Sequence, residues 1–417
     1  MGQYIIEGRN RLSGSVRIQG AKNSALPILA ATIAVGKPCV LHNCPDLSDI
    51  SSTIRILEHL GCEVRRNGGT VYVDSSRITK NFISDDMMRE MRSSIIFLGA
   101  LLSATGEAVF TAPGGCKIGL RPIDIHFDAL KKLGYEFSDK QGYIRCSRRL
   151  VKGKKIALSF PSVGATENII LATVRSSGVT TIINAAREPE IVDLAMFLNS
   201  CGARIRGAGE STIVIEGVDN LHSTNYSIIP DRIVAATFMS AAAVTGSTIV
   251  LEDVIPSHLV PVSAVFEQAG CRIETSVNML RITCPERLCG FGTIRTMPYP
   301  GFPTDCQADL MAVASIADGV TMISENIFEN RFQHVSELNL MGADIRVEDK
   351  VAVVNGVRRL QGACVCASDL RAGAALVTAG LAADGITTVD NICYIDRGYE
   401  AFADKLSALG AKIKRMD

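Results

Sequence analysis

The segment LEHLGCEV at residues 57–64 decides the fold, because five further segments along the chain repeat its pattern. In each copy a glycine separates a short amphipathic segment from a strand-like one. These glycines are 68 to 73 residues apart: Gly61, Gly134, Gly202, Gly270, Gly342 and Gly410. A fixed period of this kind is typical of a fold built from copies of one supersecondary unit. We therefore expect six copies of one unit.

The residues of the first copy predict the content of the unit. An apolar helix at 25–35 is followed by a β-branched strand at 38–43 and by a second helix with Ile50, Ile54, Leu57 and Leu60 on one face. A hairpin at 63–73 completes the copy. Because the first helix is apolar on all sides, it is expected to be buried between sheets and second helices. Each copy is thus predicted to be a βαβαββ unit.

The sixth copy stops with its hairpin unfinished, and the start of the chain resembles the missing piece. Residues 4–25 match residues 351–374 in pattern, so the N-terminus is predicted to complete the last copy. If three copies close one domain, the first domain covers 20–229, and the second joins 1–19 to 230–417. Two chain crossings then connect the domains, and we expect the active site in a cleft between them.

Composition excludes several classes of protein. The chain has 43 basic and 43 acidic residues and no net charge, which gives no overall attraction to nucleic acid or to a membrane surface. No apolar run approaches the roughly 18 to 20 residues that span a bilayer. Residues 1–11 also lack the layout of a signal peptide. The thirteen cysteines contain no C-x-x-C pair. We expect a soluble, reduced, cytoplasmic protein.

One cysteine differs from the others in its surroundings. Cys62, Cys201 and Cys271 stand at helix ends or in strands and are expected to be small buried residues. Cys116 lies in PGGCKIGLRP at 113–122, between glycines and cations that favour a reactive thiol. The alternative for Cys116 is an incidental surface thiol.

Cations recur at one position of the repeats, just before a predicted buried helix: Lys22, Arg92, Arg232 and Arg371. Helix N-termini attract anions, so these cations predict a binding site for anionic substrates. The alternative is a set of solvated side chains that pair with acids such as Asp231 and Asp369. Arg397 completes the set. Asp305, in GFPTD, is expected at a helix N-cap, a structural role worth about 1 kcal/mol, or as a general base.

Segments spread along the chain carry a resemblance to a known family. They are Lys22-Asn23, 113–124 (PGGCKIGLRPID), 185–193 (AAREPEIVD), 302–305 (FPTD), 328–332 (FENRF) and 396–400 (DRGYE). Together they resemble the UDP-N-acetylglucosamine 1-carboxyvinyltransferases among the enolpyruvyl transferases. The resemblance implies a two-domain inverted α/β barrel with six βαβαββ repeats, three per domain. It also implies transfer of enolpyruvyl from phosphoenolpyruvate to the 3′-hydroxyl of UDP-N-acetylglucosamine in peptidoglycan synthesis, with no metal or organic cofactor.

The same resemblance implies the role of each site residue. Cys116 is the acid and forms an adduct with phosphoenolpyruvate, Asp305 is the base, and Asp369 handles protons. The cations around phosphoenolpyruvate are Lys22, Arg121, Arg371 and Arg397. The nucleotide-sugar contacts are Arg92, Arg121, Pro122, Ile123, Asp124, Ile125, Ser162, Val163, Gly164 and Ile327, with Asp124 accepting a hydrogen bond from the uracil. Asn23 and Asp305 are further substrate-binding residues. Many relatives carry Lys where this chain has Phe160, so one contact is missing or comes from Lys154 or Lys155.

Other functions stay open at this point. The enolpyruvyl transferase of 3-phosphoshikimate shares the repeat plan but lacks the cysteine loop, which argues against it. A non-catalytic nucleotide-sugar sensor is a further alternative, against which stands the joint presence of Cys116, Lys22, Asp305 and Arg397. A nucleic-acid binder rests on the basic stretch 148–155, but no aromatic residue interrupts it. We expect a monomer or a weak homo-oligomer.

Overall fold

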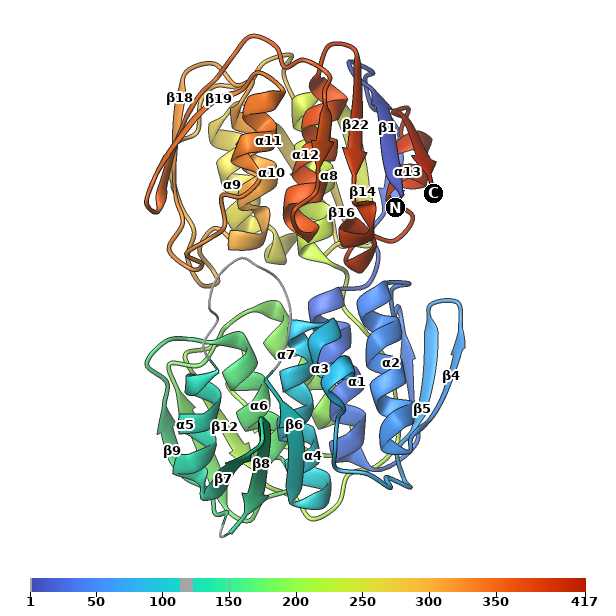
Figure 1. Cartoon of the computed structure of the whole chain (residues 1–417), viewed down its shortest axis with the longest axis vertical. Coiled ribbons are helices and arrows are strands. Elements are labelled where there is room, and N and C mark those ends of the chain that lie inside the picture. The colour runs from blue at the N-terminus through green and yellow to red at the C-terminus, as the bar shows by residue number, and fades with distance from the viewer. Residues whose placement is uncertain (1, 113–122, 150) are drawn as a thin grey trace. The chain divides into compact units, whose positions relative to one another are not determined.

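The computed structural model describes residues 2–112, 123–149 and 151–417. Its contacts divide these residues into two compact units. The first unit consists of residues 20–112, 123–149 and 151–229, and the second unit of residues 2–19 and 230–417. Figure 1 colours the chain from blue to red, so the second unit contains both the bluest strand and all the red elements.

Three buried helices form the centre of each unit. In the first unit they are α1 (Lys22–Val35), α4 (Phe97–Thr105) and α6 (Val163–Thr173), and in the second unit α8 (Arg232–Val244), α10 (Gln307–Ala314) and α12 (Leu370–Ala382). Within each unit the three helices pack against one another. In Figure 1, α8, α10 and α12 lie between β18 and β19 on one flank and β22 and β1 on the other. All residues from Ile233 to Val244 are buried, as expected for a helix that is apolar on all sides.

The strands of the described residues form six sheets, three in each unit. Those of the first unit are β13 (Thr224–Ser227), β3 (Cys39–His42), β5 (Thr70–Asp74) and β4 (Glu63–Asn67); β6 (Glu107–Thr111), β8 (Tyr143–Arg148) and β7 (Tyr135–Lys140); and β11 (Arg204–Arg206), β12 (Thr212–Glu216), β10 (Val179–Ile183) and β9 (Lys155–Ala157).

The sheets of the second unit follow the same plan. They are β15 (Arg272–Thr275), β16 (Met279–Thr283), β14 (Thr248–Glu252) and β2 (Ser15–Arg17); β17 (Gly292–Arg295), β18 (Val320–Ser324), β20 (Val351–Asn355) and β19 (Asp344–Glu348); and β21 (Cys364–Cys366), β22 (Ile386–Asp390), β1 (Gln3–Glu7) and β23 (Lys412–Met416). Each four-stranded sheet has one parallel pair and two antiparallel pairs, which is the pairing expected of a βαβ crossover followed by a hairpin.

A second helix precedes the hairpin in every copy. These helices are α2 (Ser48–Leu60), α5 (Asp124–Leu133), α7 (Pro189–Ser200), α9 (Val260–Gln268), α11 (Val335–Leu340) and α13 (Phe402–Ala408). The six repeat glycines that follow them all have φ between 90° and 107°. At Gly61 the backbone N–H donates to the carbonyls of Glu58 and Leu57, so this left-handed residue closes the helix and starts the hairpin. The sixfold repeat is therefore confirmed.

The N-terminal strand completes the last sheet, as predicted. Strand β1 lies between β22 and β23 and pairs with both in antiparallel register. The chain crossings also exchange strands between copies. Strand β2 of the first copy pairs with β14, and β13 of the fourth copy pairs with β3. Each unit therefore holds three sheets even though the second unit is not continuous in sequence.

The second copy departs from the predicted plan. An additional short helix, α3 (Asp85–Glu90), precedes its first helix, and that first helix begins as the 3₁₀ turn η1 (Arg92–Ile96). Its first strand is reduced to a bridge between Phe82 and Val109. The hydroxyl of Ser94 lies 2.8 Å from the carbonyl oxygen of Met91 and 3.1 Å from that of Met88. This local hydrogen bonding competes with a regular helical start.

Candidate functional site

A cluster of buried charges surrounds Asp305 in the second unit. Arg331 Nη2 lies 2.8 Å from Asp305 Oδ1, and Arg371 Nη2 lies 3.0 Å from Asp305 Oδ2. The side chains of Arg331 and Arg371 are only 4% and 6% exposed, whereas that of Asp305 is 25% exposed. The carboxylate is thus oriented by two buried guanidinium groups and keeps access to solvent.

The expected N-cap position of Asp305 is wrong. Asp305 lies inside the 3₁₀ turn η3 (Thr304–Cys306), whose N-cap residue is Pro303. Helix α10 begins only at Gln307. Two guanidinium groups bind the carboxylate more strongly than backbone N–H groups do, because both partners are charged.

The alternative of a solvated side chain does not hold for Arg371, whose side chain is buried. Asp369 is the N-cap of α12, and its Oδ1 accepts hydrogen bonds from the N–H groups of Arg371 and Ala372, at 2.8 and 3.1 Å. Because that carboxylate caps the helix, the buried Arg371 guanidinium binds Asp305 instead. Lys22 is likewise largely buried, with 12% of its side chain exposed.

The segment around Arg397 is held by a residue at the chain crossing. Arg397 is the last residue of η4 (Ile392–Arg397) and is half-buried. Gln19 Nε2 donates to the carbonyl of Gly398 at 3.1 Å, and Gln19 Oε1 accepts from the N–H of Glu400 at 2.8 Å. The amide of Gln19 therefore fixes the backbone that follows Arg397.

Glu325 joins the segments that carry Asp305 and Ile327. Its Oε1 accepts from the N–H of Ile327 at 2.9 Å, and its Oε2 accepts from the hydroxyl of Thr304 at 2.9 Å. Glu325 is buried. The structure thus brings these two predicted site segments together through a carboxylate that was not among the predicted site residues.

Lys22 begins α1 of the first unit and forms an ion pair with the first turn of α2. Its Nζ lies 3.2 Å from Asp49 Oδ2, and the Asp49 side chain is only 7% exposed. The next residue, Asn23, is exposed. A cation and an exposed amide thus stand side by side at the start of a buried helix.

The starts of α5 and α6 lie against each other in the first unit. Ile123 is the N-cap residue of α5, and Asp124 and Ile125 form its exposed and half-buried first residues. Ser162 caps α6 by accepting a hydrogen bond from the N–H of Ala165 at 3.3 Å, ahead of Val163. A Cβ atom on Gly164 would lie 2.9 Å from the His126 ring. Only glycine allows this approach, so these predicted nucleotide-sugar residues are neighbours.

Some predicted site residues cannot be placed in the same way. Cys116, Arg121 and Pro122 lie outside the described residues, and Arg92 is placed only by its backbone, as the first residue of η1. Phe160 is 40% exposed.

Lys154 does not point freely from the chain, because its Nζ donates to the carbonyl of Lys132 at 2.8 Å.

Arg331 was not predicted as a site residue, although FENRF was among the family segments, because its partner Asp305 is distant in sequence. His334, which is buried next to these charges, was not predicted either. Burial lowers the pKa of His334 to about 4, against the opposing effect of Asp369. In the first unit, burial and the carboxylates of Glu190 and Glu188 raise the pKa of Glu167 well above its usual value.

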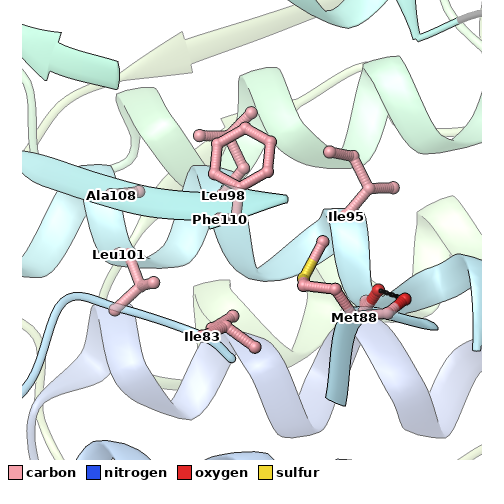
Figure 2. Close-up of a pocket in the computed structure, with 8 residues that line it drawn as sticks. Ile83, Met88, Ile95, Leu98, Leu101, Ala108 and Phe110 are labelled. Carbon is pink, nitrogen blue, oxygen red and sulfur yellow. Dashed lines mark hydrogen bonds between the residues drawn. The ribbon is translucent and has the colours of Figure 1, made fainter. Parts of the chain in front are cut away.

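Other features of the described residues do not form a site. A pocket with no room for a water molecule is lined by Ile83, Met88, Ser94, Ile95, Leu98, Leu101, Ala108 and Phe110. Figure 2 shows apolar side chains around it, so it belongs to the core of the first unit. Cys62, Cys201 and Cys271 are buried, as predicted. Among the described residues, no group of three His, Cys, Asp or Glu side chains is placed to hold a metal ion.

None of the described helices is long and apolar enough to cross a membrane.

Solved structures share this fold. The enolpyruvyl transferase NikO from Streptomyces tendae has a TM-score of 0.91 and 26% identity, with 100% of this chain and 99% of that chain covered. An EPSP synthase from Acinetobacter baumannii has a TM-score of 0.75 at 20% identity, with both chains fully covered. The fold is therefore the two-domain fold of the enolpyruvyl transferases.

Sequence comparison narrows the class. The family described as EPSP synthase (3-phosphoshikimate 1-carboxyvinyltransferase) matches residues 6–406. UDP-N-acetylglucosamine 1-carboxyvinyltransferase 2 of Caldanaerobacter subterraneus subsp. tengcongensis is 51% identical over 416 residues, 100% of each chain. UDP-N-acetylglucosamine 1-carboxyvinyltransferase 1 of Carboxydothermus hydrogenoformans is 47% identical over 417 residues, 100% of this chain and 99% of that one. The chain belongs to the UDP-N-acetylglucosamine 1-carboxyvinyltransferase family of enolpyruvyl transferases.

Proposed function

We propose that the chain transfers the enolpyruvyl group of phosphoenolpyruvate to the 3′-hydroxyl of UDP-N-acetylglucosamine, with release of phosphate, as the first committed step of peptidoglycan synthesis. The observation that carries this proposal is the full-length identity of 51% to an enzyme of that name. The charge cluster at Asp305 supports it, because the reaction needs a carboxylate acceptor next to cations that bind anions.

The chemistry assigns a task to each kind of residue. The sugar hydroxyl oxygen forms a bond to C2 of phosphoenolpyruvate while C3 takes up a proton, and phosphate then leaves as C3 gives up a proton. Asp305 accepts the proton of the attacking hydroxyl, and Cys116 donates the proton to C3. Asp369 takes part in the later proton transfer. Neither metal nor organic cofactor is required by these steps.

The cations bind the charged groups of phosphoenolpyruvate. Arg121, Arg371 and Arg397 suit its carboxylate and phosphate through their planar guanidinium groups, and Lys22 supplies a point charge. In the second unit, the ion pair between Arg371 and Asp305 sets the base next to one of these cations. The expected cleft between the domains stays a prediction.

The nucleotide sugar is proposed to bind through polar groups at helix starts. Asn23, Arg92, Asp124 and the segment Ser162–Gly164 all stand at or beside the first residues of helices. Unpaired N–H groups at such positions suit the diphosphate. Asp124 accepts a hydrogen bond from the uracil, and Arg121 to Ile125 and Ile327 complete the contacts.

Phosphate release with purified protein tests the proposal. We expect release from phosphoenolpyruvate with UDP-N-acetylglucosamine and none with 3-phosphoshikimate, the acceptor named for the matching family. Release with 3-phosphoshikimate alone would favour the sister reaction, and release with neither would favour a sensor. We further propose a cytoplasmic monomer or weak homo-oligomer.

A further inference from the structure

A chain of hydrogen bonds leads from Asp305 into the core of the second unit. Arg371 uses Nη2 for Asp305, at 3.0 Å, and donates from Nη1 to Tyr399 Oη at 3.1 Å. Tyr399 Oη lies 2.9 Å from Thr237 Oγ1, and Thr237 donates to Asp309 Oδ2 at 2.6 Å. The chain thus connects an accessible carboxylate to a buried one through three intervening side chains.

The number of protons fixes the direction of these bonds. Thr237 has one hydroxyl proton and two acceptors within reach, the carbonyl oxygen of Ile233 at 3.2 Å and Asp309 Oδ2 at 2.6 Å. The nearer and charged carboxylate accepts it. In its bond with Tyr399, Thr237 must therefore be the acceptor, so Tyr399 donates its single proton to Thr237. In the bond between Tyr399 and Arg371, the tyrosine oxygen is then the acceptor. Every donor therefore points from Arg371 towards Asp309. This order depends on Asp309 being an acceptor.

The linking residues lie on separate elements of one core. Thr237 comes from α8, Asp309 from α10 and Arg371 from α12, while Tyr399 follows η4. All are buried. The Arg371 guanidinium also lies over the Tyr399 ring, 5.7 Å from its centroid. Because these side chains are buried, bulk water does not replace a hydroxyl that is removed, and its neighbours lose a hydrogen-bond partner.

Asp309 is a carboxyl group that changes charge within the pH range in which turnover can be measured. Burial raises its pKa to about 6, against the lowering effect of the Thr237 hydroxyl. Its Oδ1 and the Thr378 hydroxyl are both buried, and this hydroxyl also lowers the pKa of Asp309. The titratable groups facing Asp309 are Arg371, Tyr399 and Cys306.

Burial raises the pKa values of Tyr399 and Cys306, so both are neutral near pH 6 while Arg371 is charged. A titration near this pH is thus assigned to Asp309 rather than to a group around it.

Resting on the proposed function, we propose that Tyr399, Thr237 and Asp309 are positioning residues for the transfer reaction. The Asp309 carboxylate orients the hydroxyls of Thr237 and Tyr399, and Tyr399 holds the Arg371 guanidinium in the orientation that binds Asp305. The three residues act through Arg371, which presents a fixed cation to phosphoenolpyruvate and a fixed base to the sugar hydroxyl.

Removal of a single hydroxyl tests the middle of the chain. In Tyr399→Phe we expect kcat to fall about tenfold while the KM for UDP-N-acetylglucosamine changes less than about threefold, because misplacement of a catalytic group lowers turnover more than binding. Tyr135→Phe is the matched control: Tyr135 is also buried and donates to the carbonyl of Ala172 at 3.1 Å, in the first unit. Equal kcat in the two variants would overturn the proposal.

Two substitutions of Asp309, the buried end of the hydrogen-bond chain, test its role through the dependence of kcat on pH. We expect wild-type kcat to rise with pH through an inflection near 6, since ionised Asp309 is the acceptor that orders the chain. Asp309→Asn keeps an acceptor but cannot titrate, so it should lose this inflection and retain several times more kcat than Asp309→Leu. An unchanged inflection in Asp309→Asn would contradict the proposal.

The outcomes separate the two levels of inference. If Asp309→Leu does not fold, Thr237→Val breaks the same link, and its kcat is expected to fall as in Tyr399→Phe. No phosphate release by the wild-type protein with UDP-N-acetylglucosamine would refute the proposed function. Wild-type release together with full kcat in Tyr399→Phe and Thr237→Val would refute the positioning role alone.

Discussion

Arg371 and Asp305 form an ion pair although 66 residues separate them, with Arg371 Nη2 3.0 Å from Asp305 Oδ2. Arg331 binds the other oxygen of the same carboxylate at 2.8 Å. A second carboxylate, Asp384, also binds two arginines, Arg9 at 2.7 Å and Arg359 at 3.3 Å, and its side chain is 26% exposed. The difference lies in the arginines, which are buried at Asp305 and about half exposed at Asp384.

These two carboxylates make a matched pair for mutation. Asp305→Ala should lower the free energy of unfolding by about 2 to 3 kcal/mol, because it leaves two buried guanidinium groups without their partner. Turnover should fall at least about a hundredfold with the loss of the base. Asp384→Ala should destabilise the chain far less and keep turnover, since its partners are exposed. Denaturant unfolding measures the stability of the two variants, and phosphate release measures their turnover. Equal destabilisation by the two substitutions would contradict the role given to the buried arginines.

Lys22→Ala should also lower turnover strongly. Loss of one charge-assisted contact to phosphoenolpyruvate costs on the order of 2 to 4 kcal/mol in the transition state. Arg397→Lys should be impaired as well, because a point charge cannot replace the planar guanidinium group. Steady-state kinetics at saturating UDP-N-acetylglucosamine give the comparison, and wild-type kinetics in Arg397→Lys would exclude a bidentate contact.

The proposed acid predicts a change in pH optimum. Cys116→Ala should abolish turnover at neutral pH with little loss of nucleotide-sugar binding. Cys116→Asp should stay active with its optimum at lower pH, because a carboxylic acid donates the same proton from a lower pKa. Turnover measured from pH 5 to 9 distinguishes the variants. Full activity in Cys116→Ala would exclude the acid role.

Asp309 should make the protein less stable as pH rises. Its pKa is about 6 in the folded chain and 3.8 as an ordinary carboxyl group, so the folded state holds the proton more tightly. The stability present below pH 4 is lost as pH rises through 6, by about 3 kcal/mol at most. Asp309→Asn should remove this loss. The variant Asp219→Asn, at an exposed position, serves as the control. Urea unfolding at pH 4, 6 and 8 tests whether the free energy of unfolding changes with pH differently in the two variants.

His334 should act in the opposite direction. Burial lowers its pKa from 6.5 to about 4, so the unfolded chain binds this proton more tightly. Stability is complete above pH 6.5 and falls as pH drops towards 4, again by about 3 kcal/mol at most. His334→Gln should flatten this acid limb, whereas the exposed His222→Gln should leave it unchanged. Parallel acid limbs in wild type and His334→Gln would contradict a buried neutral imidazole.

The sequence was sufficient for features that repeat. Six glycines at a constant period predicted the six copies, because each marks a left-handed residue between a helix and a hairpin. The likeness of residues 4–25 to 351–374 predicted the strand that completes the last sheet, since β20 and β1 hold the same position in their copies. Periodicity of this kind is visible in one sequence without knowledge of contacts.

The charge cluster around Asp305 could be predicted only in part from the sequence. Cations at helix starts identified Lys22 and Arg371, but Arg331 meets Asp305 only through packing of elements that are not repeat-equivalent. The role of Asp305 as an N-cap was misjudged because a 3₁₀ turn, rather than the α-helix, follows Pro303. Asp309, Thr237 and Tyr399 belong to segments whose sequence predicts ordinary apolar core. Their hydrogen bonds become apparent only from the distances in the structure.

The place of β1 in the last sheet has a consequence for synthesis on the ribosome. Residues 20–229 have all their strand partners once β13 has been made. The strand Gln3–Glu7 pairs with Ile386–Asp390 and Lys412–Met416, which are synthesised after all of residues 20–229. It must therefore stay unpaired while the whole of the first unit is produced. The second unit can close this sheet only after Met416 has been added to the chain, so the first unit has the earlier opportunity to fold.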